Sequence, residues 1–223
     1  MSDLWRPSVA EPLTELRGTA VPILRDNIDT DTISPGSAPP WRKSATFGER
    51  GSATLADDLF ANWRYTGEGR LIESFPLNEP RYQGARFLIT GANFGCGSSR
   101  ESAVWMLAAW GIRCVIAPSF AEIFSANCFA NGLLPVVLAN DLVSELADEA
   151  SSAGGAFELD LAQRSLRRPS GRDITFHIPE YRRQGLMRGL DDIAQTLNDL
   201  AAIQKFVATG RRQFPWIYRR AAW

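Results

Sequence analysis

The chain has 223 residues, of which 24 are Lys or Arg and 25 are Asp or Glu, so its formal net charge is −1. This balance excludes the strong positive field of a nucleic-acid-binding protein. A hydrophobic content of 45% and an aromatic content of 10% exclude a disordered chain. The length predicts one large domain, or one domain with a small appendage.

No segment predicts export or membrane insertion. Residues 1–7 carry no apolar run of the kind found in signal peptides. The longest apolar run, residues 133–139, is interrupted by Pro135, whereas a membrane span needs about 20 residues. We therefore expect a cytoplasmic protein.

The cysteines and the single histidine argue against a metal site on this chain. Cys96, Cys114 and Cys128 form no CxxC pair, and their odd number argues against a disulfide framework. His177 lies in an alternating stretch that is typical of a strand, so we interpret it as an ordinary strand residue rather than a catalytic one. Any metal chemistry would need ligands from another chain.

The first part of the chain is rich in loops. The pattern predicts, in order, a strand at 18–24, a polar loop at 25–35, a long mobile loop at 36–54 and a helix at 55–65.

The middle of the chain alternates between strands and helices. It predicts strands at 85–90, 113–117 and 133–138, a helix at 101–110 that stops at Gly111, and a second helix that opens with a capping box at 119–122 and runs to 132. This alternation predicts an α/β fold with a parallel sheet and right-handed crossovers.

The last third predicts a mixed set of elements. It gives a helix at 140–150, strands at 157–161 and 173–178 with turns at 165–171 between them, an amphipathic helix at 191–208, and a basic, aromatic tail at 209–223. The tail is either a surface segment or a docking strip, and the surface segment is the more ordinary reading.

A glycine-rich loop at 91–99 carries the clearest chemical signal. Its three glycines let the backbone approach a ligand closely. The helix that follows offers a partial positive charge, and Arg100 adds a fork suited to a carboxylate or phosphate. Ser98 and Ser99 add hydroxyl groups. Together these residues predict an anion pocket that contains a hydroxyl placed for deprotonation.

Other anion-binding loops do not match this segment. A P-loop needs a lysine, and the dinucleotide pattern G-x-G-x-x-G is absent. A cysteine-phosphatase loop would separate Cys96 and Arg100 by more than three residues. A plain glycine-rich turn with a serine helix cap stays open as an alternative.

This loop resembles the signature of the small subunit of isopropylmalate isomerase, in the family of the aconitase swivel domain. The resemblance extends over most of the chain. The matching segments are 26–31 (DNIDTD), 59–65 (LFANWRY), 82–85 (YQGA), 95–101 (GCGSSRE), 115–124 (VIAPSFAEIF), 131–136 (NGLLPV), 181–183 (YRR) and 189–193 (GLDDI).

The resemblance implies a single swivelling β/β/α domain over 1–223 that docks on a large subunit as a heterodimer. That partner would carry a 4Fe–4S cluster, and this chain would carry no cofactor. The implied reaction is the dehydration and rehydration of a 2-alkylmalate, as in leucine biosynthesis.

The resemblance also assigns roles to individual residues. Ser98 matches the catalytic base, which acts as an alkoxide stabilised by backbone N–H groups and by Arg100. Ser99 and Arg100 match residues that hold a substrate carboxylate. Asp31 matches an active-site acid, and Arg42 or Lys43 occupies the place of a further substrate-binding cation in the mobile loop.

The sequence departs from the family pattern at two places. Ser102 stands where the family usually has His, and Ser34 and Gly36 lie in a segment that usually reads Ile-Ile-Pro-Lys/Ala. Extra residues also appear near 49–54. In the family this loop helps to read the substrate side group, so the resemblance leaves another 2-alkyl- or 2-arylalkylmalate from a specialised pathway as an alternative substrate. A non-catalytic carboxylate-binding module is a second alternative, supported by Ser102 alone.

Overall fold

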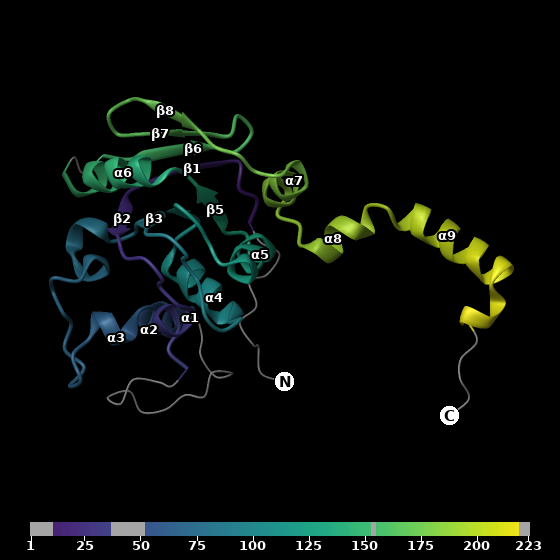
Figure 1. Ribbon diagram of the computed structural model, residues 1–223, viewed down its shortest axis with the longest axis horizontal. Coiled ribbons are helices and arrows are strands. Elements are labelled where there is room, and N and C mark those ends of the chain that lie inside the picture. Colours follow the sequence, from purple (N-terminus) through teal and green to yellow (C-terminus); the bar gives the residue numbers. More distant parts are fainter. Residues whose placement is uncertain (1–10, 37–51, 153–154, 219–223) are drawn as a thin grey trace.

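The body of the protein contains two four-stranded sheets (Figure 1). The structure is a computed structural model that describes residues 11–36, 52–152 and 155–218. The first sheet is parallel, in the order β2 (Ala20–Ile23), β3 (Phe87–Thr90), β4 (Cys114–Ala117) and β5 (Leu134–Val137). The second is antiparallel, in the order β1 (Glu15–Gly18), β6 (Phe157–Asp160), β7 (Ser165–Arg167) and β8 (Asp173–Thr175).

Helices connect the strands of these sheets, and the last of them extend beyond the sheets. In chain order they are α1 (Thr30–Ile33), α2 (Ser52–Asp58), α3 (Ala61–Arg64), α4 (Glu101–Trp110), α5 (Glu122–Ala130), α6 (Asn140–Ser152), α7 (Glu180–Arg188), α8 (Asp192–Leu197) and α9 (Leu200–Gln213), with 3-10 turns at Pro76–Asn78, Pro80–Tyr82 and Pro215–Tyr218. None of the helices in the described residues is long and apolar enough to cross a membrane.

The parallel sheet separates two hydrophobic cores, because alternate side chains of each strand point to opposite faces. Leu88 and Val115 join the core beneath α2 and α4. Ile89 and Ile116 join the core that α6 and the antiparallel sheet share. Strand β4 is buried at every residue, as expected for a parallel strand covered on both faces.

The carboxyl ends of β2, β3 and β4 lie at one edge of the parallel sheet, and the loops that follow them are joined there. Asp29 pairs with Cys96, and Phe94 pairs with Phe120, as isolated parallel bridges. The backbone N–H of Asn27 also donates to Ala92 O (2.8 Å). Loops that are far apart in the sequence therefore meet at a single place.

The expectation of an α/β fold with a parallel sheet is confirmed. The helix predicted at 101–110 has those bounds, and Gly111 ends it in the left-handed region (φ 110°). Strands β3, β4 and β5 lie within the three predicted strand segments.

Several local predictions are wrong. The capping box at 119–122 does not form, because Ser119 Oγ instead accepts a hydrogen bond from Asn93 N–H and α5 has no side-chain cap. The predicted helix at 55–65 is divided at Phe60, whose φ of 51° interrupts it. Residues 52–54 of the predicted loop are helical, and residues 37–51 lie outside the described residues.

The C-terminal half also differs from the prediction. Residues 165–167, expected to be turns, form β7 because Arg164 takes the left-handed turn (φ 55°) one residue earlier. Helix α7 was not predicted, although Gly189 marks its end. The helix expected at 191–208 is two helices, α8 and α9, which together with the turn Pro215–Tyr218 form a C-terminal arm, residues 192–218.

Candidate functional site

The residues of the glycine loop, 91–100, connect β3 to α4 and line a cavity of about 210 Å³. Thr30 and the first turns of α5 complete its wall. The lining residues are Thr30, Gly95, Gly97, Ser98, Ser99, Arg100, Ala121, Glu122, Ile123, Phe124 and Asn127. The sequence-predicted residues Ser98, Ser99 and Arg100 therefore share one cavity.

Glycine is required at the centre of this loop. Gly95 has a φ of 76° and Gly97 a φ of 85°, in the left-handed region that other residues rarely adopt. A Cβ atom on Gly95 would also overlap the ring of Phe124. That ring is buried and packs edge-on against Phe94, with ring centroids 5.2 Å apart. The loop can follow its path only without a side chain at position 95.

Residues 28–30 fix the main chain of the loop. Ile28 O accepts from Gly95 N–H (2.8 Å), and Thr30 N–H donates to Cys96 O (2.9 Å). The buried Thr30 hydroxyl donates to Ser98 O at 2.6 Å. Our sequence reasoning missed Thr30, although it adjoins Asp31 in the same motif. Its contact holds the backbone of Ser98 in place.

The hydroxyl groups of Ser98 and Ser99 are exposed, and neither makes a hydrogen bond within the described part of the chain. The residue that caps α4 is Arg100, with no side-chain capping bond. The alternative of a serine helix cap is therefore wrong. Both hydroxyls are available to a ligand.

Arg100 is held by the segment that contains Asp31. Its Nη2 lies 2.6 Å from Asp31 Oδ1, and its Nη1 donates to Ser34 O at 3.4 Å. A Cβ on Gly36 would lie 2.8 Å from Nη1, so the absence of a side chain there leaves room for the guanidinium. A partly exposed ion pair contributes little to stability, roughly 0–1 kcal/mol. Its effect here is to orient Arg100.

The two departures from the family pattern contact each other. Ser34 Oγ and Ser102 Oγ lie 2.9 Å apart, within hydrogen-bond distance. Ser34 is buried at the end of α1, and Ser102 lies in the first turn of α4. This bond connects the segment of Asp31 to the helix that follows Arg100.

Two helix N-termini open at the cavity, those of α4 and α5. Their partial positive charges favour an anion. Glu122, in the first turn of α5, adds a carboxylate to the wall and opposes this field, while Asn127 adds an amide. Sequence reasoning missed both residues, because they lie on the far wall in another βα unit. The cavity thus combines a cation, a carboxylate and uncharged polar groups.

Other predicted residues lie elsewhere. Arg42 and Lys43 fall outside the described residues. His177 is exposed just after β8 and does not line the cavity. Burial raises the pKa of the Cys114 and Cys128 thiols well above the usual value. The described residues contain no group of three or more His, Cys, Asp or Glu side chains placed to hold a metal ion.

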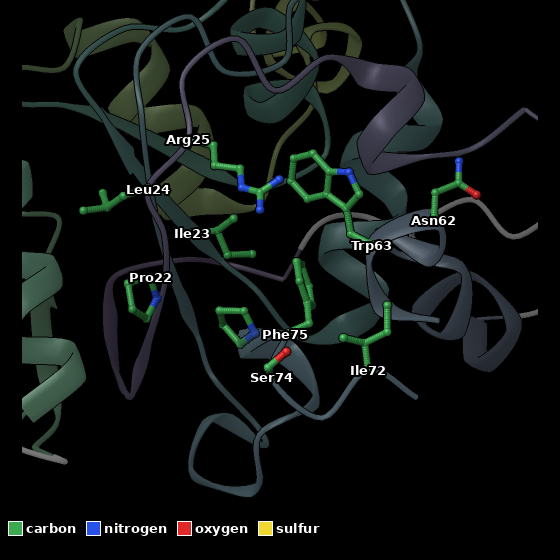
Figure 2. A pocket seen from close by; sticks show the side chains of 10 residues that line it. Pro22, Ile23, Leu24, Arg25, Asn62, Trp63, Ile72, Ser74 and Phe75 are labelled. Carbon is green, nitrogen blue, oxygen red and sulfur yellow. The ribbon is translucent and has the colours of Figure 1, made fainter. Parts of the chain in front are cut away.

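A larger pocket, of about 490 Å³, lies beside β2 and α3 (Figure 2). It is mostly apolar, and its one cation, Arg25, has its guanidinium carbon 4.6 Å from the centre of the Trp63 ring. Among the described residues that line it, none is a carboxylate, a cysteine or a histidine. The free serine hydroxyls lie in the smaller cavity instead.

Comparison with known proteins gives consistent matches. A model of the Aconitase C-terminal domain family matches residues 10–141. The "3-isopropylmalate dehydratase small subunit" of Cupriavidus necator is 45% identical over 212 residues, covering 93% of this chain and 98% of its own length. The protein of the same name from Paramagnetospirillum magneticum is 41% identical over 208 residues, covering 93% of this chain and all of its own.

A solved structure is also similar. It is described as 3-isopropylmalate dehydratase from Methanocaldococcus jannaschii, with 28% identity and a TM-score of 0.58. The match covers 86% of this chain and 99% of that one.

Proposed function

The chain belongs to the aconitase C-terminal domain family, and from this premise we propose that it is the small subunit of a 3-isopropylmalate dehydratase. The enzyme would be a cytoplasmic hydro-lyase of leucine biosynthesis, active only with a large subunit. The observation that carries the proposal is the cavity in which Ser98, Ser99 and Arg100 lie together, with Arg100 oriented by Asp31.

In this proposal Ser98 is the catalytic base. It removes the proton from the carbon next to a substrate carboxylate, and later returns it. A serine hydroxyl is a weak acid, so its alkoxide needs preorganised positive charge. The N-terminus of α4 and the guanidinium of Arg100 supply that charge. Two hydrogen bonds to Ser98 O support this role, one from the Thr30 hydroxyl and one from the backbone N–H of Arg100. They fix the position of Ser98 before substrate binds.

Arg100 and Ser99 hold the substrate carboxylate. The ion pair with Asp31 occupies Nη2 of Arg100. The Nε of Arg100 makes no hydrogen bond within the described residues. A guanidinium has five N–H donors, so Asp31 and a carboxylate can be bound together. Asp31 is thus proposed to orient Arg100; its carboxyl group is exposed and lies outside the lining of the cavity among the described residues.

The described residues of this chain do not fit a 4Fe–4S cluster, because their cysteines are dispersed and two of the three are buried in the cores. We place the cluster on the large subunit, where it would activate the hydroxyl group that leaves the substrate. The cavity on this chain would then face that subunit.

A substrate with another side group is the second candidate. Ser34, Gly36 and Ser102 differ from the family pattern, and Gly36 and Ser34 contact Arg100 directly. Because Ser98, Ser99 and Arg100 are retained, these differences leave the proposed reaction in place, and a substrate with another side group is the alternative.

Co-expression with candidate large subunits tests the proposal. We expect a purified pair that isomerises a malate in a panel of isopropylmalate, citramalate, homoaconitate and bulkier alkyl- and arylalkylmalates. Turnover of isopropylmalate supports the leucine pathway, and preference for a bulkier malate supports the second candidate. Tight binding of a malate analogue by the isolated chain, measured by calorimetry, together with no turnover in any pair, would support a non-catalytic carboxylate-binding module instead.

A further inference from the structure

The C-terminal arm, residues 192–218, has almost no support from the body of the protein. It extends away from both sheets in Figure 1. Neither α8 nor α9 contains a buried residue. Its base is attached through Asp192, which accepts hydrogen bonds from Tyr181 and Arg182 of α7. Gln195 adds a second contact, since its side-chain amide donates to Leu190 O at 3.4 Å. Beyond Gln195, the contacts among the described residues are within the arm itself, such as the edge-on pair of Phe214 and Trp216.

The arm nevertheless displays large apolar side chains. Phe206 is 74% exposed and Ile193 is 73% exposed. The other exposed members are Leu197, Leu200, Ile203, Phe214, Trp216, Ile217 and Tyr218. Along α9, Leu200, Ile203 and Phe206 recur every three residues and therefore share one side of the helix. Burial of such side chains against a partner is favourable. A helix of this length without packing is marginal in water.

The relatives indicate what covers this face. An alignment that covers 93% of a 223-residue chain cannot end before about residue 207. Proteins named as dehydratase small subunits therefore share α8 and at least the first half of α9. A segment that proteins of this name have in common fits a partner that they have in common.

The position of the arm supports the same partner. Helix α7, to which the arm is attached, packs on α5. At this contact the guanidinium carbon of Arg182 lies 5.3 Å from the ring centre of Phe129. The first turns of α5 line the cavity and present the exposed Ile123. A subunit that covers the cavity is therefore adjacent, across α5, to the base of the arm.

We propose that the arm is a clamp that binds the large subunit by its apolar face. The inference rests on the proposed function. The matching surface would be an apolar groove bordered by carboxylates, because Arg211 and Arg212 follow the apolar residues at the end of α9. The arm then holds the two subunits together while the cavity performs the chemistry.

The test uses the full-length chain and a purified large subunit that gives activity with it. Phe206→Asp should weaken their association at least tenfold in calorimetry. Ala208→Asp adds the same charge two residues away, outside the apolar side, and should bind like the wild type. At saturating large subunit, kcat and KM of both variants should equal those of the wild type, because the arm does not line the cavity. Equal affinity of Phe206→Asp and wild type would overturn the clamp while activity still supports the proposed function.

Two further measurements keep the inference falsifiable. Hydrogen exchange should show the amides of 192–218 slowed when the large subunit is added, and unchanged exchange would overturn the clamp. Analytical ultracentrifugation should show the isolated chain to be a monomer. A dimer that Phe206→Asp dissociates would assign the face to a second copy of this chain and contradict our proposal. Failure of the wild-type chain to bind any large subunit would overturn both this inference and the proposed function.

Discussion

The glycine loop and the C-terminal arm receive opposite degrees of support from the fold. The loop is held by backbone bonds from residues 28–30, by the ring of Phe124 and by the ion pair of Arg100. The arm has no buried residue in either helix. A catalytic group needs a fixed position before substrate arrives, whereas a clamp gains its order from the partner. In our proposal the fold of this chain alone fixes the glycine loop, whereas the arm becomes ordered only when the large subunit binds.

Of the changes in the loop, replacement of the proposed base, Ser98, should have the largest effect, and the quantity that it changes is turnover. Ser98→Ala should lower turnover of the assembled enzyme by roughly 10²- to 10⁴-fold, the range for loss of a general acid–base group. Association with the large subunit should stay unchanged. Ser144→Ala is the control, because that hydroxyl bonds only Asn140 O on the outside of α6. Near-normal turnover of Ser98→Ala in steady-state assays would contradict the assignment of the base.

Addition of one methyl group to the loop should also have a large effect, in this case on the stability of the protein. Gly95→Ala combines a left-handed φ with overlap on Phe124, and we expect it to lower the free energy of unfolding by about 2 kcal/mol or more. Urea unfolding measures this change. Gly67→Ala is the matched control, since a Cβ there has no atom within 4 Å. If the two variants were equally stable, the loop would not be constrained as described.

A double-mutant cycle should detect the bond between Ser34 and Ser102. Each single change to Ala leaves one hydroxyl without its partner, so the double variant should be more stable than the two single effects predict. The expected coupling is about 1 kcal/mol in urea unfolding. The same variants should raise KM and lower kcat together, because the bond helps to position Arg100, which is proposed both to hold the substrate carboxylate and to stabilise the Ser98 alkoxide. A coupling near zero would show that the contact has no energetic role.

The smallest effect concerns Glu180, the first residue of α7, the helix that precedes the arm. Hydrogen bonds from Arg183, Gln184 and Arg164 lower the pKa of Glu180 to about 2. A carboxyl with a lowered folded-state pKa contributes stability above its unfolded pKa, near 4.3, and loses it as the pH falls toward 2. Glu180→Gln should therefore lower Tm slightly at pH 6 and have almost no effect at pH 2. A difference in Tm that is the same at both pH values would contradict this account.

Local sequence patterns predicted the elements at the centre of the fold, because residues close together in the chain determine where these elements begin and end. Helix α4 has an apolar stripe and a terminating Gly111, and both were visible in the sequence. The division at Phe60 was not predictable, because its N–H donates to Ile33 O, 27 residues earlier. The same holds for Ser119, whose side chain bonds Asn93 instead of capping α5. Tertiary partners override local preference at these positions.

The chemistry of the site could be predicted only in part. The motif gave Ser98, Ser99 and Arg100, since they are adjacent in the chain. It did not show that Asp31 would bind Arg100 or that Thr30 would hold Ser98 O, because those pairs are 69 and 68 residues apart. Glu122 and Asn127 carried no signal, since their place on the cavity wall depends on how two βα units pack.

A structure of the assembled heterodimer with a bound malate tests the central claim most directly. Our account predicts that the Ser98 hydroxyl lies within hydrogen-bonding reach of the substrate carbon that loses its proton, that Arg100 binds a substrate carboxylate, and that the glycine loop faces the cluster of the large subunit. A complex in which that loop faces solvent, with substrate bound by other residues, would contradict it.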